Sequence, residues 1–143
     1  MSAYKYNFQL RSFISSQFAF AGNRFFCCWC NSDGDAENLR AVLVPKMVNY
    51  TKIGLSKQLI ETPSIVISQQ EIRAQGLQDV RLYRFWLQSA GSRYTVDIPL
   101  GKNEQGIDDV IAVLARNCVD AGGNAVEVVA YRAYGVDIVE EGF

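Results

Sequence analysis

The chain has 143 residues, is 49% hydrophobic and carries a net charge of -1, which is typical of one folded domain with a single core. Lys and Arg number 14 against 15 Asp and Glu, so no overall charge attracts nucleic acid or an anionic membrane. The absence of histidine removes the usual general base, the histidine-assisted Ser and Cys nucleophiles and the commonest zinc ligand, which disfavours enzyme functions.

The N-terminal residues predict two β-strands. Apolar side chains alternate over residues 3–10, as in a strand with one buried face. A second β-prone run covers residues 17–30, with a possible turn or bulge at Gly22-Asn23. Its two faces would carry Phe25, Cys27 and Trp29 on one side and Phe26, Cys28 and Cys30 on the other. Because both faces are apolar, we expect this strand to be covered on both sides.

An interrupted helix is predicted after these strands. The polar turn at residues 31–38 leads into it, and Asp35 is a suitable N-cap. Pro45 should kink the helix or divide it, and Gly54 would close the segment. The apolar stripe of the helix consists of Leu39, Val42, Leu43, Met47 and Tyr50.

Two short elements should follow. Residues 65–67 form an apolar β-prone run. Ser68 and Glu71 have the spacing of a capping box, which predicts a brief helix that ends near Gly76.

A β-hairpin is the clearest local prediction. Residues 80–88 and 93–100 alternate as strands and are joined by the turn sequence Ser-Ala-Gly-Ser at residues 89–92. Pro99 indicates the end of a strand or an edge position, because proline cannot donate to a sheet ladder.

The C-terminal part predicts an amphipathic helix and a strand. Asp108 and Asp109 lie in the first turn, where the helix dipole favours negative charge, and Gly122 and Gly123 would end the helix. Its apolar stripe consists of Ile107, Val110, Ile111, Leu114, Ala115 and Cys118. The strand should cover residues 125–139, bent at Gly135. Its inward face is either Val126, Val128 and Ala130 or Val129, Tyr131 and Ala133.

Together these elements predict an α+β fold in one domain of residues 1–143. We expect a single antiparallel-rich sheet with two main helices on one face. The order contains a β-α-β-β-α-β path preceded by an extra N-terminal strand, which makes a ferredoxin-like fold the first hypothesis. No internal repeat or linker is evident in the sequence.

The cysteines allow more than one interpretation. Cys27 and Cys30 have C-x-x-C spacing, and with Cys28 and Cys118 they could supply four thiolates to zinc. Alternation along a strand, however, sends Cys27 and Cys28 to opposite faces, which favours packing in the core. A Cys30 to Cys118 disulfide and a metal or redox role stay open as alternatives.

The acidic residues after the second strand also suggest a metal site. Asn31, Asp33, Asp35 and Glu37 alternate as in a calcium loop. The glycine and the bidentate Glu of an EF-hand are not at their positions, so a turn followed by a helix cap accounts for these residues. Asp33 and Asp35 therefore stay, with Cys27 and Cys30, as metal candidates, and we expect no cofactor.

The predicted hairpin combines basic and aromatic side chains, which could stack on single-stranded nucleic acid. These side chains are Arg81, Tyr83, Arg84, Phe85, Arg93 and Tyr94. The RNA-recognition consensus is absent and the net charge is unhelpful, so the sequence argues against this partner.

The function that we expect is that of a non-enzymatic structural or protein-interaction subunit. The chain holds 8 Phe, 7 Tyr and 2 Trp, more than one modest sheet face would bury, which favours a homo-oligomer or larger assembly. The contact surface would be the hairpin side chains or the N-terminal strands with Phe25 and Trp29. A small binding module for a ligand or single-stranded nucleic acid is the alternative, and a cysteine-dependent enzyme or metal-binding protein is the third hypothesis.

The expected location is the cytoplasm or another intracellular assembly. Polar residues such as Ser15 and Gln17 interrupt the apolar N-terminal run that a signal peptide would need. No run reaches the roughly 18 apolar residues of a membrane span.

Overall fold

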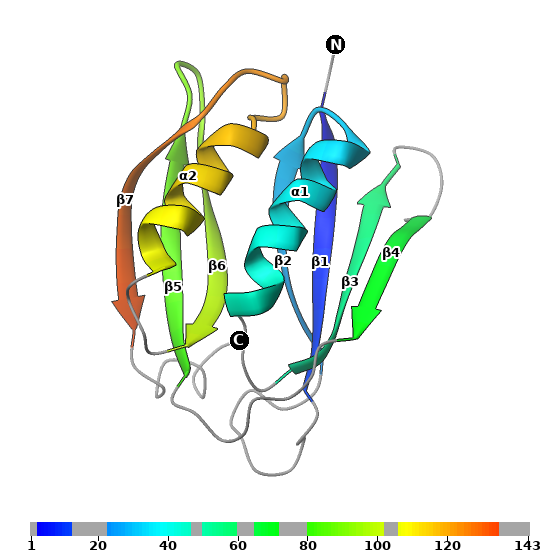
Figure 1. The fold of residues 1–143 in the computed structure, drawn as a ribbon. Coiled ribbons are helices and arrows are strands. Elements are labelled where there is room, and N and C mark those ends of the chain that lie inside the picture. Colours follow the sequence, from blue (N-terminus) through cyan, green and yellow to red (C-terminus); the bar gives the residue numbers. More distant parts are fainter. Residues whose placement is uncertain are drawn as a thin grey trace.

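The computed structural model describes residues 3–12, 23–46, 50–59, 65–71, 80–101 and 106–134. These residues form two antiparallel sheets and two α-helices, and the helices lie side by side against one face of the sheets (Figure 1). One cluster of buried apolar side chains lies between the helices and the sheets. The predicted α+β class is therefore confirmed.

The first sheet contains four strands in the order β2-β1-β3-β4. They are β1 (Tyr4–Ser12), β2 (Asn23–Cys30), β3 (Tyr50–Gln58) and β4 (Ile65–Glu71). Alternation explains the buried face of β1, where Tyr6 and Phe8 are buried and the Phe8 ring stacks on Phe26 of β2 at 4.7 Å. Residues 13–22, which include part of the predicted second strand, lie outside the described residues.

Two predictions in the middle of the chain are wrong. Tyr50 begins β3 and does not continue a helical stripe, and Ser68 and Glu71 belong to β4 and not to a helix. Both strands are held by non-local ladders, β3 to β1 and β4 to β3, which supply hydrogen bonds that a short local pattern does not reveal. Gly54, read as a closing residue, lies inside β3 opposite Gln9. Met47 and Gly76 lie outside the described residues.

The first helix, α1 (Asp33–Leu43), is shorter than the predicted stripe. Its N-cap is Ser32, not Asp35, and the Ser32 hydroxyl accepts a hydrogen bond from the Asp35 backbone N–H at 3.2 Å. Pro45 lies in a 3-10 turn, Val44–Lys46, that follows the helix, so it ends the helix and does not kink it.

The second sheet contains three strands in the order β6-β5-β7. The predicted hairpin is confirmed as β5 (Val80–Gln88) and β6 (Arg93–Gly101), and β7 (Glu127–Tyr134) pairs with the other edge of β5. Pro99 lies in β6, which is an edge strand of its sheet, as the missing N–H requires.

A β-bulge in β7 explains why the sequence allowed two alternative sets of inward-facing residues for the last strand. Val128 lies opposite Leu87 and Ala130 lies opposite Trp86, so Val129 is an extra residue in β7. Before the bulge the inward residues are Val126 and Val128, and after it they are Tyr131 and Ala133, opposite the buried Phe85 and Tyr83. Each predicted register thus holds on one side of Val129. Gly135 and the residues beyond it lie outside the described residues.

The second helix, α2 (Ile107–Asn117), confirms the C-terminal helix prediction, with Asp108 and Asp109 in its first turn. It ends before the predicted glycines, because the Cys118 N–H closes the last turn on the Leu114 carbonyl. The glycines instead belong to a turn at residues 120–124, where Gly123 has a φ of 88° and so occupies a conformation that glycine favours.

The two halves of the described chain repeat one topology. In each half a hairpin leads into a helix and a third strand that returns to the free edge of the hairpin's first strand, so β2 and β3 flank β1 as β6 and β7 flank β5. Each split β-α-β unit is complete within its own sheet. The expected single sheet is therefore not what the described strands form, and the ferredoxin-like arrangement, which interleaves two such units, is not confirmed.

Candidate functional site

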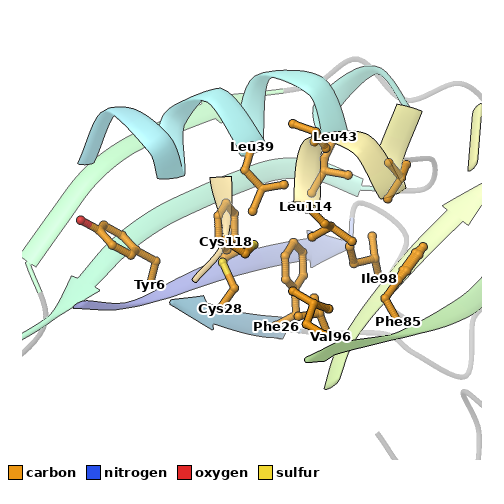
Figure 2. Close-up of a cluster of buried hydrophobic side chains, with 14 of the residues drawn as sticks. Tyr6, Phe26, Cys28, Leu39, Leu43, Phe85, Val96, Ile98, Leu114 and Cys118 are labelled. Carbon is orange, nitrogen blue, oxygen red and sulfur yellow. The ribbon is translucent and has the colours of Figure 1, made fainter. Parts of the chain in front are cut away.

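Three cysteines come together in the core where the two halves meet. Cys28 and Cys30 point inward from β2, and Cys118 is the C-cap residue of α2. All three are buried, and their Sγ atoms lie within 4.8 Å of one another, with 3.9 Å between those of Cys28 and Cys30. Figure 2 shows the Cys28 and Cys118 side chains adjacent to each other among the apolar residues beneath the helices. We call Cys28, Cys30 and Cys118 the thiol cluster.

Sequence and local structure explain why these thiols converge. Residues two apart on a strand share a face, so Cys28 and Cys30 both point toward the helices. After α2 the chain runs beside β2, and the Val119 N–H donates to the Trp29 carbonyl at 2.8 Å. This backbone bond fixes Cys118, the preceding residue, over the two strand cysteines.

The thiols influence one another's ionisation. Hydrogen bonding with Cys118, then with Cys30, and burial raise the pKa of the Cys28 thiol. Hydrogen bonding with Cys118 likewise raises the pKa of Cys30. Cys118 accepts hydrogen bonds from Cys28 and then from Cys30, which lower its pKa. Cys28 and Cys30 therefore stabilise a thiolate at Cys118.

Of the four cysteine and acidic metal candidates, three lie outside the thiol cluster, and only Cys30 belongs to it. Cys27 is on the opposite face of β2, half-buried, and its thiol donates to the Asn7 side chain at 2.9 Å. Asp33, in the first turn of α1, accepts a hydrogen bond from the Tyr6 hydroxyl at 2.7 Å and pairs with Lys57 at 3.1 Å. Among the described residues, the thiol cluster is the group of cysteine and acidic side chains whose geometry could hold an ion.

Asp35, the other acidic metal candidate, also lies outside the thiol cluster. It lies beside Asp33 in the first turn of α1, where its backbone N–H is capped by Ser32.

All four cysteines, including Cys30 and Cys118, are free thiols in this structure. Cys30 is thus the metal candidate that the fold places with other soft ligands.

The hairpin candidates divide between the core and the surface. Tyr83 and Phe85 are buried, so they are not available for stacking on a nucleic-acid base. Arg84 is on the other face, in a two-bond ion pair with Asp97 at 2.8 and 2.9 Å. Arg93 donates both of its described hydrogen bonds to Gln88 of the neighbouring strand.

Tyr94 supports the thiol cluster. Its hydroxyl donates to the Val119 carbonyl at 2.8 Å, and burial raises the pKa of this phenol. The same short segment, residues 118–120, is therefore held by β2 through Val119 N–H and by β6 through Tyr94. The structure thus gives Tyr94 a structural contact within the chain.

Trp29 lines an open pocket of about 530 Å³. The lining residues are Ala3, Tyr4, Lys5, Trp29, Gln58, Leu59 and Ala121. The side chains of Phe25 and Arg81 lie outside the described residues.

The outer strands of the two sheets carry exposed apolar side chains. Among the described residues, the large hydrophobic side chains that are exposed are Tyr4, Ile65, Val66, Val129 and Tyr131. The last four lie on β4 and β7, the strands farthest from the seam between the sheets (Figure 1). Tyr4 is covered on one side by Lys57, whose Nζ lies 4.7 Å from the ring centroid.

Sequence reasoning missed the thiol cluster as a group. The C-x-x-C spacing drew attention to Cys27, although a C-x-C pair on a strand is the pattern that shares a face. The same reasoning placed Cys118 on the apolar face of its helix, but no local signal shows that this helix ends over β2. It also missed β4 and β7 as exposed edges, because sheet order depends on long-range pairing.

Comparisons of the chain with protein-family models, with curated proteins and with solved structures found no match. No helix in the described part of the chain is both long enough and apolar enough to cross a membrane.

Proposed function

We propose that this protein is a non-enzymatic interaction subunit that pairs with a second copy of itself through the outer edge of β7. The observation that carries the proposal is the position of the exposed apolar side chains on edge strands. Val129 is 44% exposed and Tyr131 is 49% exposed, and in the described part of the chain β7 pairs with β5 alone. An edge strand of this kind offers backbone donors and acceptors to another strand.

The sequence of β7 favours a second copy as the partner. Because Val129 is a bulge residue, Glu127 and Arg132 lie on the same face, opposite Gln88 and Arg84 of β5. In a two-fold antiparallel pair centred on the bulge, Glu127 of each copy would lie opposite Arg132 of the other, and Val128 would lie opposite Tyr131. Both contacts form twice, as a symmetric dimer requires.

The other outer edge is less complementary to itself. A self-pair of β4 about its centre would place Ile65 opposite Glu71, an apolar side chain against a carboxylate. Val66, 64% exposed, nevertheless provides a matched control, because it is the same residue type on an edge strand. We therefore assign the contact to β7 and use β4 as the reference edge.

The test is Val129→Lys compared with Val66→Lys. Burying the exposed part of Val129 contributes about 1 kcal/mol per copy, or about 2 kcal/mol per dimer. Its loss should weaken the dimer roughly 30-fold. In this register position 129 of each copy lies opposite Ala130 of the other, so the two introduced lysines would lie on either side of the axis, close enough to add repulsion. Sedimentation equilibrium gives the dimer constant for both variants. An equal loss in Val66→Lys, or no loss in Val129→Lys, would contradict the assignment to β7.

A small-ligand site is the second candidate function, because the pocket beside Trp29 has a volume of about 530 Å³, within the range of ligand sites. Lys5 gives it a cation and Trp29 an aromatic surface, a combination suited to an anionic aromatic molecule. Anilinonaphthalene sulfonate is a suitable probe. Its fluorescence should rise with the wild type and stay low with Trp29→Ala, and an equal rise in both would exclude this pocket.

A further inference from the structure

The strongest feature that the proposed function does not use is the thiol cluster. Three thiolates bound to one ion at about 2.3 Å lie roughly 3.3–4.0 Å apart, with the shorter distances for a pyramidal ion. The Cys28 and Cys30 sulfurs are already 3.9 Å apart, and all three lie within 4.8 Å. A contraction of about 1–1.5 Å would therefore bring Cys118 into coordination.

Packing alone does not require sulfur at this place. The repeated topology supplies a comparison, because β6 and α1 in the other corner of the fold correspond to β2 and α2 here. Ile98 and Leu100 are buried residues of β6, and Val44 is the C-cap residue of α1, as Cys118 is of α2. The corresponding corner is thus built from aliphatic side chains, which fill such a space without reactive groups.

The donor set selects the kind of ion. Thiolates are soft ligands that favour thiophilic ions over calcium or magnesium. The chain has no histidine, and no described carboxylate belongs to the group, so the cluster offers three ligands of one type. A structural zinc site normally takes four protein ligands, which this cluster does not provide.

Burial selects the charge of the ion. Net charge in an apolar core is costly, and the cluster lies among buried side chains such as Phe26 and Leu39. Three thiolates with a monovalent ion leave two negative charges, and with a divalent ion they leave one. A trivalent ion leaves none.

We propose that Cys28, Cys30 and Cys118 form a binding site for one thiophilic trivalent ion, with arsenic(III) as the ion that fits the ligand number and the charge. Arsenous acid, As(OH)₃, would react with the three thiols. Three As–O bonds break and three As–S bonds form, and each hydroxide leaves with one thiol proton as water. The oxidation state of arsenic does not change, so the step needs no oxidant or reductant.

The bound ion would join the two halves of the fold. Two of its ligands come from β2 in the first sheet and one from the end of α2. The segment that carries Cys118 is held to β2 by the backbone hydrogen bond from Val119 to Trp29. Transient loss of that bond gives arsenous acid a route to the thiols, and the three As–S bonds would then hold the segment in place.

The experiment is a titration with arsenous acid alone, read by native mass spectrometry, after a phosphine reductant has been removed. The variants are Cys118→Val, which copies the residue at the corresponding corner, and Cys27→Val, which removes a thiol from the same strand but the opposite face. The wild type and Cys27→Val should bind one arsenic per chain with loss of three protons. Cys118→Val should bind at least about tenfold more weakly, because one ligand is missing.

Arsenic X-ray absorption of the loaded wild type provides a reading that does not depend on the folding of any variant. Three sulfur neighbours support the site. Two sulfurs and one oxygen, equal binding by Cys118→Val, loss of binding in Cys27→Val, or formation of a disulfide from the cluster in place of ion binding would each overturn it.

Discussion

The contact between Asp33 and Tyr6 joins the start of α1 to the first sheet, and it makes a testable energetic prediction. Tyr6 is buried, and its hydroxyl donates to the Asp33 carboxylate at 2.7 Å. The same oxygen accepts the Lys57 ammonium at 3.1 Å. Asp33→Ala removes the acceptor of a buried hydroxyl, Tyr6→Phe removes the donor, and the double variant removes both.

The size of the coupling free energy depends on the burial of Tyr6 and on the solvent exposure of Asp33. A hydrogen bond to a charged group contributes about 1.5–3 kcal/mol. Asp33 is 49% exposed, so solvent screens part of this energy and most of the ion pair with Lys57. We therefore expect a coupling free energy of about 1–2 kcal/mol between Asp33 and Tyr6.

The contribution should depend on pH. The hydrogen bond from Tyr6, with help from Lys57, lowers the pKa of Asp33 below its usual value. A carboxyl group with a lowered pKa in the folded state stabilises the fold above its unfolded pKa of about 4. This stabilisation is lost as the pH falls through the lowered pKa. Asp33→Asn should therefore be less stable than the wild type at pH 7, and the difference should vanish in strong acid.

Urea denaturation of the four proteins in the cycle measures the coupling. A matched cycle on Arg84 and Asp97, whose side chains are 38% and 26% exposed, should give less than about 1 kcal/mol. A coupling near zero for Asp33 and Tyr6, or a difference between Asp33→Asn and the wild type that grows in acid, would refute the reasoning.

Two further predictions concern the turn after α2. In urea denaturation, Gly123→Ala should lower the free energy of unfolding by about 1–2 kcal/mol, because the backbone φ at Gly123 is 88°. The control is Gly91→Ala, which has open space around the added Cβ and should change the free energy of unfolding by less than about 0.5 kcal/mol. Asp120→Ala should lower the melting temperature more than Asp97→Ala does, because Asp120 accepts from the Gly122 and Asn124 backbone N–H groups and from Ser89. Equal melting temperatures for Asp120→Ala and Asp97→Ala would show that the hydrogen bonds to Asp120 do not stabilise the fold more than the Asp97 ion pair does.

The elements with strong local signals could be predicted from the sequence. The hairpin β5-β6 has alternation and a turn sequence within one short stretch, and α2 has an acidic first turn and a regular apolar stripe. Both were found at nearly their observed bounds. Local chemistry was sufficient there because neighbours in sequence are also neighbours in space.

The elements that depend on long-range pairing could not be predicted in the same way. Among the β3 side chains that the structure describes, Ile53 and Leu55 are the buried ones, on either side of Gly54, and the strand exists because β1 and β4 pair with it. The repeated topology is reflected in one sequence motif, Tyr-x-Phe-x-Leu, which occurs at residues 6–10 in β1 and at residues 83–87 in β5. Two short motifs were too little to reveal it without the structure.

The candidate site shows the same limit. Alternation correctly separates Cys27 from Cys28, because it is a local property of a strand. That Cys118 reaches Cys28 and Cys30 depends on the end of α2 and on the Val119 bond to β2, which join residues far apart in sequence. The exposed edge at Val129 likewise depends on sheet order and on a bulge.

Self-association is the central claim, and a sedimentation-velocity series of the wild type at increasing protein concentration tests it most directly. The account predicts a monomer that converts to a dimer as the concentration rises, with no discrete species larger than the dimer, because the two-fold contact through β7 uses that edge in both copies. A single monomeric species at every concentration would contradict it.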